Sequence, residues 1–96
     1  MSKFLAAAVG FASIAATVVA SAEPPAGAAA CTGCHPASAR VTSPVPRLAG
    51  LDRAAIVRAM QDFRSGTRAA TVMDRIAKGF TDEEIQAIAA WYAASR

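Results

Sequence analysis

The chain has 96 residues, of which 54% are hydrophobic and 18% are charged, and its formal net charge is +3. This length accommodates one small domain rather than several, because domains typically contain about 50 to 200 residues. The ten basic residues are spread out, without a run or interleaved aromatic side chains, and this pattern argues against a nucleic-acid-binding protein.

The first 22 residues, MSKFLAAAVGFASIAATVVASA, begin with a single positive charge, continue as an uncharged apolar run and end in Ala20-Ser21-Ala22. This order predicts a secretory signal peptide and export to the periplasm. An uncleaved membrane anchor is the alternative, because the run approaches the roughly 18 to 20 residues that span a bilayer. Its small residues favour cleavage, which leaves residues 23–96 as the domain, with no stable membrane insertion expected.

Removal of 22 residues from 96 leaves 74, which is few for a stable core. Domains of this size often depend on disulfides, metals or cofactors for stability. The two cysteines, Cys31 and Cys34, would close only a tiny disulfide loop, which constrains the unfolded chain weakly. We therefore expect a bound group to supply part of the core.

The first half of this domain predicts a short helix followed by a long loop. The helix begins within EPPAGAAA and reaches Cys31, because its two prolines lie where a first helical turn tolerates them. Residues 36–50, PASARVTSPVPRLAG, have no periodicity and contain three prolines and a final glycine, which is typical of a loop. No part of the sequence alternates as a strand does.

The second half predicts helices. The first runs from Asp52, a suitable N-cap, to Gly66. Its apolar residues recur at helical spacing: Ile56, Met60 and Phe63. Thr71 is then expected to cap a single short turn over residues 72–78.

The last helix has the clearest start signal. Thr81 and Glu84 have the spacing of a capping box, while Phe80 and Ile85 occupy the two positions of a hydrophobic staple. One broad apolar face follows, formed by Ile85, Ile88, Trp91 and Tyr92. The prediction is a small all-α domain of three or four helices.

Residues 30–37, ACTGCHPA, contain both cysteines and the only histidine of the chain. A redox dithiol would need a helix beside a sheet, and no strands are predicted. A zinc site would need four ligands, and only three candidates exist. The pattern C-x-x-C-H fits covalent haem attachment, in which Cys31 and Cys34 hold the porphyrin and His35 ligates the iron. We therefore expect one covalent haem c.

The second axial ligand is expected to be a methionine, because His35 is the only histidine. Met60 and Met73 are the candidates in the domain. Met60 lies on the apolar stripe of a regular helix, where methionine usually fills core space. Met73 lies in a loop or first-turn position, from which a side chain can project inward at an unusual angle. We favour Met73, and an open sixth position is the alternative.

The motif CTGCH, the later PRLAG, a methionine in the second half and an aromatic pair near the end together resemble a class I cytochrome c. The resemblance covers essentially all of residues 23–96. The segment FRSGTRAATVMDRIAKGFTDEEIQAIAAWYA is similar to the cytochrome subunit of flavocytochrome c sulfide dehydrogenase and to bacterial cytochromes of the c4 and c553 types. It implies a class I cytochrome c fold around one haem, with Met73 as a ligand.

The resemblance also implies roles for single residues. Cys31 and Cys34 match the thioether cysteines, and His35 matches the proximal ligand. Pro46 matches a proline whose carbonyl accepts a hydrogen bond from that histidine ring, which raises the basicity of the ring. Leu48 matches a leucine that packs against the haem.

Trp91 matches an aromatic residue of the last helix that packs against the N-terminal helix.

Two features depart from the family pattern. Pro36 follows the motif where glycine is usual, and proline fixes φ where glycine leaves it free. The N-terminal helix is also short, because Gly27 comes only four residues before Cys31.

A haem with histidine and methionine on its two faces leaves no position for a substrate, and methionine ligation raises the reduction potential. The resemblance therefore implies a periplasmic protein that transfers single electrons between redox partner proteins. Its partner would be a flavoprotein sulfide dehydrogenase, for which it serves as haem subunit or electron acceptor. No flavin motif is present, so no catalytic site of its own is expected. A free-standing electron shuttle and a haem-based ligand sensor are the alternatives.

Overall fold

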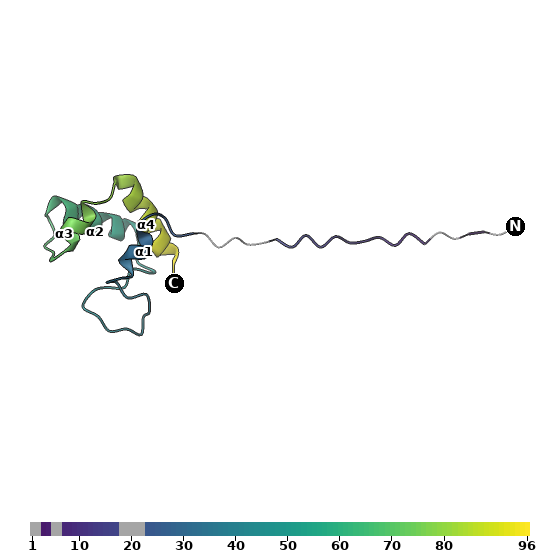
Figure 1. The fold of residues 1–96 in the computed structure, drawn as a ribbon, viewed down its shortest axis with the longest axis horizontal. Coiled ribbons are helices and arrows are strands. Elements are labelled where there is room, and N and C mark those ends of the chain that lie inside the picture. Colours follow the sequence, from purple (N-terminus) through teal and green to yellow (C-terminus); the bar gives the residue numbers. More distant parts are fainter. Residues whose placement is uncertain (1–2, 5–6, 18–22) are drawn as a thin grey trace.

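The computed structural model describes residues 3–4, 7–17 and 23–96. The predicted cleavage site, Ala20-Ser21-Ala22, lies outside the described residues. Residues 7–17 are exposed and have no regular secondary structure (Figure 1). In the part of the chain that the structure describes, no helix combines the length and the apolar character needed to cross a bilayer.

The described residues form helices and loops and contain no strand, which confirms the predicted all-α class. The helices, in chain order, are α1 (Ala28–Cys31), α2 (Arg53–Ser65), α3 (Met73–Ala77) and α4 (Asp82–Ala94). Helix α2 packs against both α3 and α4. Figure 1 shows α1 near the C-terminal end of α4, and α3 at the far side of the domain. The long loop between α1 and α2 extends away from the helices.

Helix α2 has the two ends that the sequence predicts. The Asp52 side chain accepts a hydrogen bond from the backbone N–H of Ala55 at 3.1 Å, which satisfies one of the free donors of the first turn. Gly66 ends the helix at φ 81°, in the left-handed region that favours glycine.

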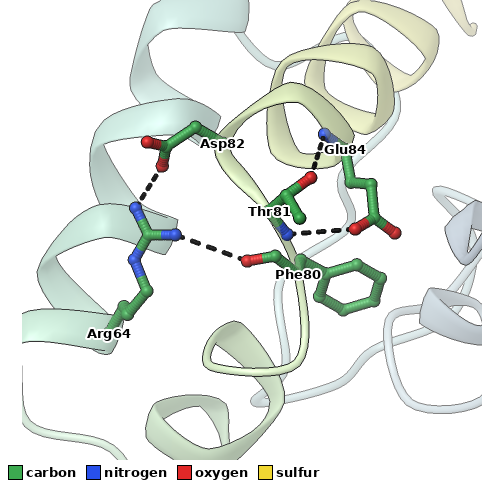
Figure 2. Close-up of polar contacts among 5 residues, drawn as sticks. All are labelled: Arg64, Phe80, Thr81, Asp82 and Glu84. Carbon is green, nitrogen blue, oxygen red and sulfur yellow. Dashed lines mark hydrogen bonds and ion pairs between the residues drawn. The ribbon is translucent and has the colours of Figure 1, made fainter.

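Helix α4 begins with the predicted capping box. The Thr81 hydroxyl accepts from the N–H of Glu84 at 3.2 Å, and the Glu84 carboxylate accepts from the N–H of Thr81 at 3.1 Å (Figure 2). Arg64, in the last turn of α2, donates to the Phe80 carbonyl at 3.3 Å and forms an ion pair with Asp82. The start of α4 is therefore held by local caps and by a neighbouring helix.

The predicted cap of the short middle helix is wrong. Val72, and not Thr71, occupies the N-cap of α3, and no side chain caps it, because valine has no hydrogen-bond acceptor. The helix therefore begins one residue later than expected. Met73 is its first residue, which is the first-turn position that the sequence analysis assigned to it.

Among the described residues, the core consists of eight buried hydrophobic residues, three of them alanines: Ala28, Ile56, Val57, Ala77, Ile85, Ile88, Ala89 and Tyr92. The short α1 joins this core despite its length. Its first residue, Ala28, is fully buried, and the Tyr92 hydroxyl donates to the Ala28 carbonyl at 2.5 Å. Trp91 is half-buried and packs against the same core. The contact between the first and last helices is thus present.

Candidate cofactor site

A cavity of about 740 Å³ lies beside the core. Residues of α1, α2, α3 and the N-terminal half of α4 contribute to its wall. Most of its lining side chains are apolar. Its wall includes all six residues that the sequence analysis assigned to the haem site: Cys31, Cys34, His35, Pro46, Leu48 and Met73. Residues separated by up to 42 positions in the sequence are therefore brought to one space.

The motif residues are placed by a tight turn at the end of α1. Cys31 is the last residue of this helix, and its carbonyl accepts hydrogen bonds from the N–H of Cys34 at 3.2 Å and of His35 at 2.9 Å. The chain thus folds back on itself within four residues. As a result, both thiols and the imidazole reach the wall of the same cavity.

The ring of His35 is held by the loop that follows. Its Nδ1 lies 2.5 Å from the carbonyl oxygen of Pro46, as the resemblance implied. A carbonyl can only accept, so Nδ1 must carry the proton in this bond. In the neutral ring, Nε2 then keeps its lone pair, which makes it the nitrogen available to a metal.

Both candidate methionines border the cavity. Met73 does so from the first residue of α3, and Met60 from the middle of α2, where it is half-buried and also contacts the core. Because the two thioethers share one cavity, the preference for Met73 still depends on its place at the start of a short helix.

The cavity wall contains aromatic residues that the sequence analysis assigned to other roles. Phe63 follows Ile56 and Met60 on the apolar stripe of α2, which the sequence analysis treated as core. In the structure Ile56 is buried, whereas Met60 and Phe63 are half-buried and line the cavity. Phe80, the staple residue before α4, lines it too. Helical spacing marks such a face, but it does not tell a protein core from a cofactor pocket.

The Cys31 thiol does not have the environment of a reactive cysteine. Burial raises the pKa of the Cys31 thiol above its ordinary value, so this group is protonated at neutral pH. Reactive dithiols instead have a lowered pKa, because the thiolate is the nucleophile. In residues 3–4, 7–17 and 23–96, no three His, Cys, Asp or Glu side chains gather as a metal-binding group.

The residues around the cavity fit a c-type haem. Two thiols at C-x-x-C spacing, an imidazole with a free Nε2 and a thioether are the donor set of such a group. The cavity volume also lies within the range of about 300 to 1,000 Å³ that is usual for ligand sites. The geometry and the donor set are therefore consistent with one planar, largely apolar cofactor.

Comparison with known proteins points the same way. No family model matches the chain. It is 42% identical over 62 residues to the cytochrome subunit of sulfide dehydrogenase of Chlorobaculum tepidum, a match that covers 65% of this chain and 56% of that protein. It is 43% identical over 65 residues to the thiosulfate dehydrogenase electron acceptor of Stutzerimonas stutzeri, covering 66% and 30%.

A third relative is cytochrome c-552 of Acidithiobacillus ferridurans, which is 37% identical over 62 residues, covering 65% of this chain and 27% of the relative. The matched region thus spans about half of the first relative and less than a third of the other two. All three names describe a cytochrome or an electron acceptor.

Proposed function

The chain resembles the class I cytochromes c, and from this premise we propose that it is a periplasmic c-type cytochrome that transfers single electrons to or from a sulfur-compound dehydrogenase. One observation carries the proposal. A single, mostly apolar cavity is bordered by Cys31, Cys34 and His35 and also by Met73, which lies far from them in the sequence.

Each of these residues has a distinct task in the proposed site. Cys31 and Cys34 would attach the haem, His35 would ligate its iron through Nε2, and Met73 would supply a thioether ligand. Pro46 orients the His35 ring through the hydrogen bond to Nδ1. When bound, the haem would supply an iron centre that gains or loses one electron.

Apolar side chains surround the proposed haem site. Leu48, Ile56 and Phe63 line the cavity without offering a polar group. With two protein ligands the iron would have no coordination position left for a substrate, which would favour electron transfer. We therefore assign no catalytic step to this chain.

The proposed partner is a dehydrogenase subunit that oxidises a reduced sulfur compound. Two relatives are named as the cytochrome subunit of sulfide dehydrogenase and as the electron acceptor of thiosulfate dehydrogenase, which supports this class of partner. A flavoprotein is the specific version that we propose. Its catalytic activity would belong to the partner, with this chain receiving the electrons one at a time.

The ligand assignment is tested by two variants of the purified haem protein. Met73→Ala is expected to abolish the weak long-wavelength sulfur-to-iron absorption band of a His/Met haem, because it removes the thioether from the iron. Met60→Ala, which shortens a methionine on the same cavity wall, is the matched control and should retain the band. Loss of the band in Met60→Ala alone would reverse the assignment.

The functional class is tested on the reduced wild-type protein. A closed, six-coordinate site is expected to leave its absorption spectrum unchanged under carbon monoxide, whereas rapid binding would indicate a ligand sensor. Haem-dependent peroxidase staining after denaturing electrophoresis tests covalent attachment separately. A protein band on the gel that does not stain would show that the cysteines hold no haem.

A further inference from the structure

Two hydrogen bonds cross the base of the long loop between α1 and α2. The first joins His35 Nδ1 to the Pro46 carbonyl at 2.5 Å. In the second, Arg47 Nε donates to the Ala37 carbonyl at 3.0 Å. On one side of the loop the bonds involve the adjacent residues Pro46 and Arg47. On the other side they involve His35 and Ala37, which flank Pro36, the residue that departs from the family pattern. We call this pair of hydrogen bonds the clamp.

The rest of the loop makes no further hydrogen bond that crosses it. Every other hydrogen bond found within residues 36–46 joins residues at most three apart: Val41 N–H to Ser38 O, Arg40 N–H to Ser38 Oγ, and Val45 N–H to Ser43 Oγ. Pro36 has no N–H with which to tie the chain from inside the clamp. The base of the loop therefore depends on the bonds made by His35 and Arg47.

Arg47 is suited to this task by its burial and its surroundings. It is half-buried, whereas Arg40 in the same loop is exposed. The one ion pair found among the described residues joins Arg64 to Asp82, so no carboxylate in that part of the chain competes for the Arg47 guanidinium. The side chain reaches back over ten residues to a backbone carbonyl instead.

We propose that Arg47 is a positioning residue for His35. Because Arg47 and Pro46 are adjacent, fixing Arg47 to Ala37 also fixes the Pro46 carbonyl opposite the His35 ring. Loss of the Arg47 bond lets the loop end move, and the bond between Pro46 and His35 opens more often. This inference rests on the proposed function, since it concerns the orientation of the proposed axial ligand.

The test compares Arg47→Leu with Arg40→Leu in the haem protein, because leucine has no hydrogen-bond donor, whereas the glutamine Nε2 would take the place of the arginine Nε. Both variants remove one positive charge from the same loop, but Arg40 makes no side-chain hydrogen bond within the described residues. NMR of the reduced protein measures the exchange of the His35 ring N–H with solvent. A hydrogen bond contributes about 1 kcal/mol, so exchange should be about fivefold faster in Arg47→Leu and unchanged in Arg40→Leu.

The reduction potential provides a second readout that a merely structural role would not move. A weaker bond to Pro46 makes the His35 ring less basic and thus a poorer partner for ferric iron. Arg47→Leu is therefore expected to have a higher potential than Arg40→Leu, which has lost the same charge. Arg47→Lys keeps the charge and a donor, so its His35 ring N–H should exchange more slowly than that of Arg47→Leu.

The outcomes separate this inference from the function on which it rests. If the wild-type chain carries no covalent haem, both are overturned. If all variants carry haem and retain the sulfur-to-iron band, equal exchange rates in Arg47→Leu and Arg40→Leu overturn the clamp alone. Equal exchange rates in Arg47→Leu, which lacks a donor, and Arg47→Lys, which keeps one, likewise contradict an explanation by hydrogen bonding.

Discussion

Gly27 is the N-cap of α1 and lies against the Phe80 side chain. Its φ is +85°, in the region that L side chains rarely adopt. A Cβ built on it would also lie 2.5 Å from Cε1 of Phe80, closer than any real contact. Backbone conformation and packing thus demand glycine for two independent reasons, and the Phe80 ring can lie directly against the helix start.

Gly66 allows these two reasons to be separated. It has almost the same φ, +81°, but no atom lies within 4 Å of an added Cβ. Gly66→Ala should therefore lower the free energy of unfolding by the backbone term alone, about 1 to 2 kcal/mol. Gly27→Ala should lower it by about 1 to 3 kcal/mol more, because the Phe80 ring must move. Denaturant unfolding of both variants measures the difference, and equal losses would exclude the packing effect.

At the scale of the helices, the structure distinguishes two threonines that were both predicted to be caps. Thr81 caps α4 through its hydroxyl, whereas Thr71 caps nothing, because α3 starts from Val72. Thr81→Ala is therefore expected to lower stability by about 1 kcal/mol. Thr71→Ala, an exposed change of the same size, should have little effect. Thermal unfolding compares the two, and a similar loss in both would contradict the assigned caps.

Arg64 makes the clearest link between two helices that are separated in sequence. It donates to the Phe80 carbonyl and pairs with Asp82, as Figure 2 shows. Because the side chains of Arg64 and Asp82 are 32% and 67% exposed, the ion pair itself contributes less than about 1 kcal/mol. The bond to the carbonyl adds a contribution of about 1 kcal/mol.

Arg64→Gln is accordingly expected to lower the free energy of unfolding by about 1 to 2 kcal/mol. Arg58→Gln is the matched control, since it removes the same charge from an exposed position of α2 with no side-chain hydrogen bond in the described part of the chain. If both variants lose the same stability in urea unfolding, net charge rather than the link to α4 explains the effect.

On the scale of the whole molecule, the core and the proposed cofactor site share their side chains. Ile56, Ile85 and Ile88 are buried in the core and also line the cavity. Three of the eight buried residues are alanines, which bury little apolar area. A domain with so small a core would gain much of its stability from a group that fills the cavity, because binding to the native state alone stabilises that state.

Removing the attachment points tests this dependence. The double variant Cys31→Ser, Cys34→Ser is expected to lose covalent haem and, with it, cooperative thermal unfolding followed by far-ultraviolet circular dichroism. Thr32→Ser changes the same motif and keeps both thiols, so it should unfold like the wild type. A haem-free double variant that still unfolds cooperatively would show that the protein core is sufficient.

Short-range features were the most predictable from the sequence. The ends of α2 at Asp52 and Gly66 and the capping box of α4 follow from residues within one or two turns of each other. The proposed haem motif is equally local, since its three reactive groups lie within residues 31–35, but its role stays a prediction. The Thr71 prediction failed at the same range, because the sequence does not reveal which of two adjacent residues leaves the helical conformation first.

The sequence by itself therefore determined the helical class and the main helix ends, and it supplied the hypothesis of a haem motif at residues 31–35. Only the tertiary structure decided that Met60 and Phe63 face a cavity, that Tyr92 bonds to Ala28, and that Arg47 crosses the loop beside Pro36. The physical reason is the distance in sequence between the residues that interact. A cap depends on neighbouring dihedral angles, whereas these contacts join residues up to 64 positions apart and exist only after the helices have packed.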